Sequence, residues 1–287
     1  INSIICDSLM AQMGRFVQAS NGSAQMIKIF YRTSFVIALL FFTCIPGNSA
    51  KAKYASLIID AHTGLELHSR NANTKKFPAS LTKIMTLYMI FDALENKKWS
   101  LRKRLKVSRR ASRQPQTRLG LKRGSTITVK TAILALITRS ANDVATVVAE
   151  NMSGSEIKFA RQMTKKARKL GMVRTTFRNA SGLPNRRQLS TARDMAKLAI
   201  AIRTDFPQYY HFFKTKKFRY RGRTYRNHNM LLGRYSGTDG VKTGYTNASG
   251  YNLVASVKRR GKHLIGIVFG GKTGPRRDRH MVNLFDR

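Results

Sequence analysis

The stretch TDGVKTGYTNASGYNLV, from Thr238 to Val254, alternates like a strand that enters a hairpin, and it contains the tripeptide Lys-Thr-Gly. The same tripeptide returns at Lys272 to Gly274, inside FGGKTGPRRD. The first copy follows Thr-Asp-Gly and precedes another strand-like run, whereas the second ends a strand and meets Pro275. A lysine, a hydroxyl and a glycine can supply a fixed charge, a hydrogen bond and room for a ligand backbone. We therefore predict that the first copy binds a ligand and that the second belongs to a loop.

A second motif lies far upstream, in FPASLTKIMTLYMIFDALE. Ser80 and Lys83 are three residues apart at a predicted helix start, so both side chains lie on one face and the lysine nitrogen can reach the hydroxyl. The nearly continuous apolar residues that follow predict a buried helix. Burial lowers a lysine pKa because it disfavours the ammonium, and a serine nucleophile needs a neighbouring base.

A third motif, RSAND, falls between the other two, at a break between predicted helices. Ser140 offers a hydroxyl that can relay a proton, and Asn142 offers an amide that can hold a substrate amide. Ser-x-x-Lys alone occurs often by chance. The ordered set Ser-x-x-Lys, Ser-x-Asn and Lys-Thr-Gly is the signature of penicillin-binding proteins and class A β-lactamases. Three motifs in this order are a much more specific signal than Ser-x-x-Lys alone.

With these motifs and their flanking sequence, the chain resembles the serine D-Ala-D-Ala carboxypeptidases, the low-molecular-weight penicillin-binding proteins. The likeness covers nearly all of residues 54–287 and includes RSANDVATVVAE, NASGLPNRRQLSTARDMAKLA and NHNMLL. It implies an α+β fold of the penicillin-binding protein/β-lactamase-like type. In that fold an antiparallel sheet formed by both chain ends carries an inserted helical lobe.

The resemblance also implies an activity and a role for each motif residue. The chain would be a serine-type D-Ala-D-Ala carboxypeptidase that acts on peptidoglycan stem peptides through an acyl-enzyme on Ser80. Lys83 would take the serine proton, and Ser140 would pass it towards the leaving amine. Backbone N–H groups of Ser80 and Tyr245 would form the oxyanion hole. The implied substrate-binding residues are Asn142, Lys242, Thr243 and Gly244. β-Lactam antibiotics would inhibit the enzyme covalently.

The remaining sequence predicts elements in the order hairpin, helices, strands. Alternation predicts a β-hairpin over residues 54–70, and helical spacing predicts helices from about residue 129, after Asn142 or Asp143, over 155–170 and over 190–206. From Lys217 onward apolar and polar residues alternate with a period of two, which predicts strands and a hairpin that turns at 260–261. A terminal helix is expected after them. Sequence-distant ends then share one sheet, with the helices inserted between them.

Residues 1–52 predict a leader with a signal peptide whose start is Met26. A positively charged end precedes an apolar run over 35–45, and small residues near 50–52 suit a cleavage site. The run is shorter than the roughly 20 residues that span a bilayer, so we expect removal rather than anchoring. We therefore expect export to the periplasm or cell envelope and a catalytic domain over 53–287. Many relatives add a β-domain and a membrane-binding tail, but here we expect no separate C-terminal domain.

The formal net charge of +41 is the feature that the catalytic motifs do not explain. Such a charge favours anionic partners, and for an exported protein we expect an anionic envelope surface. We expect no nucleic acid partner, because no nucleic-acid-binding motif accompanies the basic residues. The six histidines form no His-Glu-x-x-His motif, so we expect no metal and no cofactor. His228 in particular is interpreted as a loop or surface group.

Three rival functions remain. A β-lactamase shares the motifs but needs a glutamate-held water, and the segment NASGLPNRRQLSTARD, where such a base is expected, contains no glutamate. A D,D-endopeptidase of the same family would use the same residues to cut cross-links. A non-catalytic basic envelope-binding protein could keep the fold, but the presence of Ser80, Lys83 and Ser140 together disfavours it.

Overall fold

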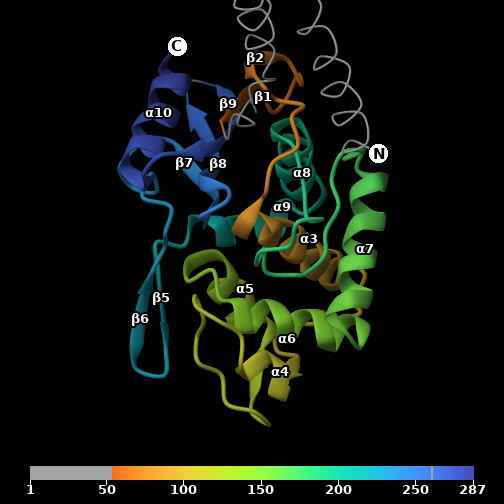
Figure 1. Ribbon diagram of the computed structural model, residues 1–287. Coiled ribbons are helices and arrows are strands. Elements are labelled where there is room, and N and C mark those ends of the chain that lie inside the picture. The colour runs from red at the N-terminus through yellow and green to blue at the C-terminus, as the bar shows by residue number, and fades with distance from the viewer. Residues whose placement is uncertain (1–53, 260) are drawn as a thin grey trace, which may run out of the picture. The chain divides into compact units, whose positions relative to one another are not determined.

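The computed structural model describes residues 54–259 and 261–287 (Figure 1). The predicted leader and its signal peptide lie outside the described residues. Within the described ranges, no helix is both long and apolar enough to cross a bilayer.

A five-stranded sheet is built from segments near the two ends of the described chain (Figure 1). Its strand order is β2-β1-β9-β8-β7, and all neighbouring pairs are antiparallel. The strands are β1 (Ala55–Asp60), β2 (Glu66–Arg70), β7 (Thr238–Thr246), β8 (Gly250–Arg259) and β9 (Lys262–Gly271). β1 pairs with β9 although about two hundred residues separate them, which confirms that segments from both ends of the described chain form one sheet.

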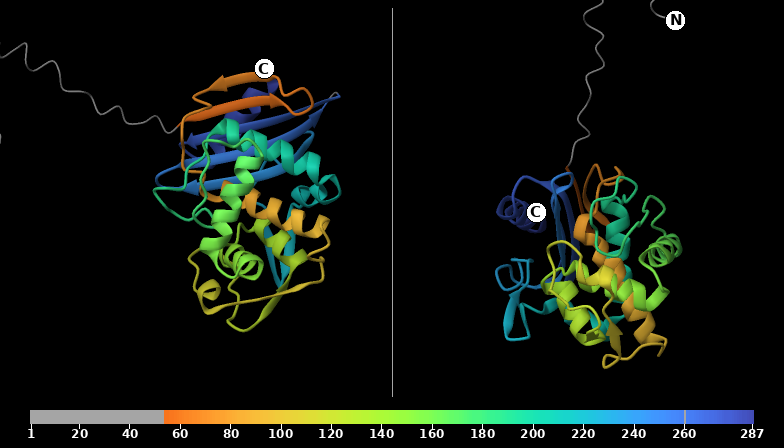
Figure 2. Two further views of the ribbon diagram at one scale, coloured as in Figure 1. Left: turned by 90° about the vertical axis from the view of Figure 1, so that its right-hand side faces the viewer. Right: turned by 60° about the horizontal axis from the view of Figure 1, so that its bottom comes forward.

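The sheet has an apolar core on each face. In β9, Ile265 and Ile267 pack into the larger core, whereas Val268 packs into a smaller core with Phe285. Successive strand side chains point to opposite faces, so an apolar run such as that of β9 needs both faces covered. Helix α10 (Gly274–Asp286) covers one face, and α8 (Ala192–Asp205) covers part of the other (Figure 2).

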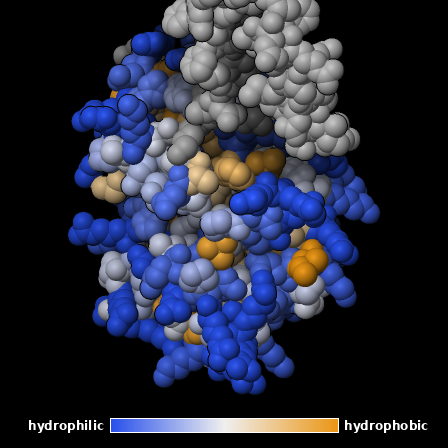
Figure 3. Space-filling view, viewed as in Figure 1, coloured by the Kyte–Doolittle hydropathy of each residue, from blue (hydrophilic) through white to orange (hydrophobic). Residues whose placement is uncertain are grey.

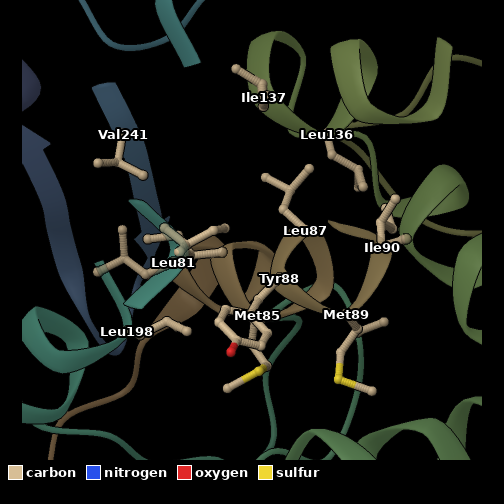
Figure 4. Packing of buried hydrophobic residues seen from close by; sticks show 14 of the residues in the cluster. Leu81, Met85, Leu87, Tyr88, Met89, Ile90, Leu136, Ile137, Leu198 and Val241 are labelled. Atoms are coloured by element: carbon tan, nitrogen blue, oxygen red, sulfur yellow. The ribbon is translucent and has the colours of Figure 1, made fainter. Parts of the chain in front are cut away.

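The helical lobe is inserted between β2 and the later strands. Its elements are η1 (Ala79–Leu81), α3 (Thr82–Glu95), α4 (Arg109–Ser112), α5 (Val129–Thr138), α6 (Asn142–Ser153), α7 (Glu156–Lys169), α9 (Pro207–Tyr210) and η2 (His211–Lys214). Helix α3 lies at its centre, where Met85, Leu87 and Ile90 point to different sides and are all buried (Figure 4). An apolar surface on all sides explains this central place.

Two small antiparallel ladders lie outside the main sheet. One pairs β3 (Arg104–Lys106) with β4 (Thr126–Thr128), and the other pairs β5 (Lys217–Tyr220) with β6 (Arg223–Arg226). The second is the predicted strand pair about Gly222, where the turn residues Arg221 and Gly222 both have positive φ. Positive φ at both turn positions is what a two-residue hairpin loop requires.

The predicted start of the second lobe helix is wrong by one or two residues. Helix α6 begins at Asn142, and its N-cap is Ala141. Asp143 does not cap it, because its carboxylate instead accepts hydrogen bonds from the backbone N–H groups of residues 119–121. A tertiary contact has replaced the local capping role that the residue type suggests.

Candidate active site

The three sequence motifs meet in one cleft of about 1190 Å³ between the sheet and the helical lobe. The lining residues include Ser80 of η1, Ser140 and Asn142 at the α5–α6 junction, and Thr243 and Gly244 of β7. β7 is an edge strand of the sheet, so one side of its backbone is not paired with another strand. An extended peptide can bind along such an edge.

Ser80 lies in the η1 turn and Lys83 in the first turn of α3, as their three-residue spacing predicted. The distance from Ser80 Oγ to Lys83 Nζ is 3.1 Å. Ala79, directly before the serine, has a φ of 47°, which costs a non-glycine residue on the order of 1–3 kcal/mol. The strained turn holds the hydroxyl at the cleft surface, while the lysine below it is fully buried.

The surroundings of Lys83 suit the neutral amine. Its Nζ atom lies 2.8 Å from Asn142 Oδ1 and donates to the carbonyl oxygen of Ser181. A neutral lysine has two N–H donors and one lone pair, so the two acceptors leave the lone pair for the Ser80 hydroxyl. Burial, and then the charge of Lys242, hold the pKa of Lys83 well below its ordinary value, while Asp143 opposes this shift.

Asn142 is engaged at both ends of its amide. Its Oδ1 accepts from Lys83, and its Nδ2 donates to the carbonyl oxygens of Pro115 and Gln116, each at 3.1 Å. The amide therefore orients the lysine and fixes the neighbouring loop. Asn142 lines the cleft, and an amide oxygen has two lone pairs, so Oδ1 can accept from a substrate N–H as well as from Lys83, which fits its predicted role in substrate binding.

Ser140 has a hydroxyl with no partner in the described part of the chain, although its side chain is buried. Its backbone is in the left-handed region, with φ 58°. Thr117 Oγ1 donates to the Ser140 carbonyl at 2.9 Å and helps to hold this conformation. A buried unpaired hydroxyl that lines a cleft is available to a substrate, as a proton relay requires.

The two Lys-Thr-Gly copies have different environments. Lys242 is 1% exposed and lies beneath the lining residue Thr243, whose carbonyl accepts from its Nζ at 3.0 Å. Burial, and then the nearby Arg277, lower the pKa of Lys242 to about 7. Lys272 is exposed, and Thr273 caps α10 by accepting from the backbone N–H of Arg276. The second copy thus forms the bend between β9 and α10 and the first residue of that helix, Gly274, which also lines the cleft.

Glycines bring the chain segments of the site close together. A Cβ added to Gly244 would lie 3.1 Å from Ser80 N, so its bare backbone lets β7 approach the η1 turn closely. Gly182 has a φ of 87°, and an added Cβ would lie 1.9 Å from the carbonyl oxygen of Ala79. Only glycine can occupy that position without moving the turn.

A model of the family described as D-alanyl-D-alanine carboxypeptidase matches residues 45–273. The chain belongs to this family. The D-alanyl-D-alanine carboxypeptidase DacC of Escherichia coli (strain K12) is 38% identical over 226 residues, which are 76% of this chain and 56% of that protein. DacF of Bacillus subtilis (strain 168) is 34% identical over 237 residues, 81% of this chain and 61% of that protein. The chain therefore spans little more than half the length of these curated relatives.

Solved structures confirm the predicted fold. Penicillin-binding protein D2 of Listeria monocytogenes, in its ampicillin-bound form, matches with a TM-score of 0.74 and 30% identity. The match covers 81% of this chain and 95% of that one. A D-alanyl-D-alanine endopeptidase of Pseudomonas aeruginosa is also similar, at 31% identity over 218 residues, 73% of this chain and 68% of that protein.

Sequence reasoning missed His228 as a residue of this carboxypeptidase-family cleft. The loop placement was right, but the side chain is half-buried and lines the cleft. Burial, and then the charges of Lys242 and other cations, lower its pKa to about 4, so the imidazole is neutral. Asn227 and Asn229 brace it, since Asn227 Oδ1 accepts from Asn229 N–H and Asn229 Nδ2 donates to the carbonyl of Gly240. The sequence feature that could have indicated this position is the pair of asparagines, Asn227 and Asn229, on either side of the histidine.

Arg277 is a second missed residue, and no sequence signal marked it. The side chain is buried, lines the cleft, and forms an ion pair with Asp278. Its Nη1 also donates to the carbonyl oxygen of Asn252 on β8. Helix α10 thus contributes a fixed guanidinium to the same cleft.

The carboxylates are arranged unlike those that a β-lactamase needs. Among the described residues, Asp278 is the acidic residue that lines the cleft, and Arg277 pairs with it. Glu156 is buried, and its two oxygens accept from Arg110 and from the backbone N–H of Ala180. This glutamate holds a loop of the lobe and does not line the cleft, which favours the peptidase over the β-lactamase.

Proposed function

We propose that this chain is a serine-type D-Ala-D-Ala carboxypeptidase that removes the terminal D-alanine from peptidoglycan stem peptides. The observation that carries the proposal is the Ser80 hydroxyl at the cleft surface, 3.1 Å from the nitrogen of a fully buried lysine. Membership of the D-alanyl-D-alanine carboxypeptidase family supports it.

In the proposed reaction, Lys83 takes the Ser80 proton as the oxygen attacks the carbonyl carbon of the penultimate D-alanine. The oxyanion accepts hydrogen bonds from the backbone N–H groups of Ser80 and Tyr245. The amide bond breaks as a proton passes through the Ser140 hydroxyl to the leaving nitrogen, which departs as D-alanine. Water then attacks the ester carbonyl while the same groups accept its proton. The ester bond to Ser80 breaks, the shortened peptide leaves as a carboxylic acid, and Ser80 regains its proton.

The substrate's terminal carboxylate needs positive charge on the β7 side of the cleft. Thr243 can donate its hydroxyl directly, since it lines the cleft. Lys242 lies just beneath, and the buried Arg277 lines the same space. We propose that these three groups bind the carboxylate, because buried cations interact strongly with a carboxylate that displaces water.

We also propose that β-lactams acylate Ser80 and that the protein works in the cell envelope, where the predicted signal peptide would deliver it. The ampicillin-bound form of the Listeria protein supports the first statement by analogy. The net charge of +41 supports an anionic envelope surface as a partner.

A D,D-endopeptidase is the second candidate, favoured by the similar Pseudomonas endopeptidase. The cleft also continues past Tyr245 to Tyr251, Gly274 and the first turns of α10, which leaves room for a larger leaving group. Purified protein that cuts cross-linked dimers faster than it trims free stem peptides would support this candidate over the carboxypeptidase.

The test is release of D-alanine from a short peptide that ends in D-Ala-D-Ala, together with labelling by a fluorescent penicillin. Ser80→Ala should abolish both while the circular dichroism spectrum stays that of the parent chain. Ser155→Ala is a matched control, because Ser155 and the exposed Lys158 repeat the Ser-x-x-Lys spacing at the start of α7, outside the cleft lining. It should lose about 1 kcal/mol of stability with its helix cap and keep full activity. Labelling that survives in Ser80→Ala would refute the assignment.

A further inference from the structure

Two segments beside the cleft contain no carboxylate. The sequence has no acidic residue between Glu95 and Asp143, and none between Asp205 and Asp239. Both segments carry exposed cations close to the cleft, and we call them the lobe rim and the hairpin rim. The lobe rim comprises Arg113, Arg118, Lys122 and Arg123, and the hairpin rim comprises Lys216, Lys217, Arg219, Arg221, Arg223, Arg226 and Arg234.

Both rims adjoin the cleft, and Arg234 of the hairpin rim lines it. The loop of the lobe rim supplies Gln116 and Thr117 to the lining, and the hairpin leads directly into the lining residues His228 and Met230. The guanidinium of Arg139, next to Ser140, lies 5.6 Å from the ring centroid of Tyr225 on β6. The hairpin therefore stands beside the lobe (Figures 1 and 2), and hydrophilic side chains cover this part of the visible face (Figure 3).

The rim cations have no carboxylate partners among the described residues. Arg110, adjacent in sequence to the lobe rim, pairs with Glu156, but no residue of either rim forms an ion pair in the part of the chain that the structure describes. In the hairpin, Lys217 stands directly opposite Arg226. Like charges opposite each other destabilise a strand pair, and a bound anion would relieve that repulsion.

The rims suit a polymer strand better than a membrane surface. Proteins that lie on membranes insert apolar side chains beside their cations. The exposed large apolar side chains of the described residues are Leu65, Leu67, Ile157, Val173, Met230 and Tyr245. None of them belongs to either rim, and Met230 and Tyr245 line the cleft itself.

We propose that the two rims hold the peptidoglycan strand whose stem peptide enters the cleft, by binding the carboxylates of its stem peptides. The inference rests on the proposed function, because continuity of the rims with the cleft is what identifies the occupant as the substrate's own polymer. Arginine dominates the hairpin rim, and its planar fork binds carboxylates in a bidentate way. The rims raise affinity for polymeric substrate and leave the chemistry at Ser80 unchanged.

Two charge-matched triple variants test the proposal by co-sedimentation with isolated peptidoglycan at low salt. The hairpin variant carries Lys217→Gln, Arg219→Gln and Arg226→Gln. The control carries Lys158→Gln, Arg161→Gln and Lys165→Gln, which are exposed on α7, across the lobe from the hairpin (Figure 1). We expect about tenfold weaker binding for the hairpin variant, as three exposed charge contacts are lost, and near parental binding for the control. Peptidoglycan with amidated carboxylates should bind the parent as weakly as the hairpin variant binds native polymer.

Equal weakening of both variants would overturn the proposal, because it would mean that net charge rather than the rims holds the polymer. Undiminished binding to amidated peptidoglycan would also overturn it, as would hairpin-dependent binding to vesicles of phosphatidylglycerol without binding to peptidoglycan. Release of D-alanine from a short peptide should be unchanged in both variants. A parent chain that binds peptidoglycan through the hairpin yet releases no D-alanine would refute the proposed function and leave this binding inference standing.

Discussion

In the proposed mechanism, two buried lysines in one site must adopt opposite protonation states. Lys83 must be neutral to accept the Ser80 proton, whereas Lys242 must be charged to attract a carboxylate. Burial lowers the pKa of each, and the repulsion between them lowers that of Lys83 further. Once Lys83 is neutral, that repulsion disappears, so the first deprotonation protects the charge on the second lysine. A substrate carboxylate then raises the pKa of Lys242 in the complex.

The pH dependence of kcat/KM follows from these shifts. On the acid side the rate should rise with pH as Lys83 loses its proton. On the alkaline side it should fall above about 7, where free-enzyme Lys242 loses its charge. In Lys242→Arg the falling limb should move to higher pH, since a guanidinium stays protonated. Steady-state kinetics on a short D-Ala-D-Ala peptide measures this, and an alkaline limb at the parental pH in that variant would contradict the assignment.

The duplicated tripeptide gives a direct comparison of one residue type in two places. Lys242→Ala should lower kcat/KM at least about 30-fold, because a buried charge-assisted contact contributes roughly 2 kcal/mol. Lys272→Ala should leave kcat/KM within about twofold of the parent, since its side chain is exposed and does not line the cleft. Equal losses in both variants would mean that the second copy also serves the substrate.

At the scale of elements, the site is a junction of three segments that pack through backbone. The η1 turn lies between β7 and the loop that contains Ser181 and Gly182. Thr86 of α3 donates to the carbonyl of Ala180 at 2.7 Å and anchors that loop to the helix. Because the contacts are backbone against backbone, the η1 turn has little freedom to move, and this would pre-organise the proposed oxyanion hole.

Gly182→Ala tests this packing. Its Cβ would collide with the Ala79 carbonyl, so we expect a destabilisation of about 2 kcal/mol or more. We also expect kcat to fall by much more than the fraction of the variant that is unfolded at the assay temperature. Gly64→Ala is the matched control, since Gly64 has a φ of 74° but nothing lies within 4 Å of an added Cβ. It should cost about 1 kcal/mol and leave kcat unchanged. Thermal melts and kinetics on both variants distinguish the two effects, because Gly64→Ala introduces only backbone strain, whereas Gly182→Ala also introduces a collision.

Local patterns in the sequence were enough to predict most elements and the residues of the three motifs. Alternation predicted the strand pairs, and the buried α3 followed from its apolar surface on all sides. The hydrogen-bond partners of individual side chains were harder to predict. Asn142 orients Lys83, and Asp143 holds residues 119–121, only because distant loops present carbonyl and N–H groups to them. The placement of Arg277 likewise depends on how α10 packs against the sheet, which no local pattern records.

At the scale of the whole molecule, the half-buried His228 and the buried His263 add an acid sensitivity to a strongly cationic protein. Burial is the main cause that lowers the pKa of His228 to about 4, and it also lowers that of His263 from an ordinary value of 6.5. His263 is 1% exposed, and its Nε2 lies 2.6 Å from Ser256 Oγ. Between pH 6.5 and about pH 4, these histidines bind protons in the unfolded chain but remain neutral in the folded chain, so the free energy of unfolding falls as pH decreases. The stability is fully present above about pH 6.5.

We therefore expect the free energy of unfolding to be up to about 4 kcal/mol lower at pH 5 than at pH 7.5, about 2 kcal/mol for each of the two histidines, measured by urea denaturation at constant ionic strength. His263→Gln removes one titrating group and keeps a partner for Ser256, so it should flatten this pH dependence even if it lowers stability at pH 7.5. His211→Gln, at an exposed position, should keep the parental slope. Added salt separates a second cause, because repulsion among the surface cations is screened, whereas the penalty for a proton on a buried imidazole persists. A slope that vanishes at high salt in the parent chain would assign the acid sensitivity to net charge and not to the histidines.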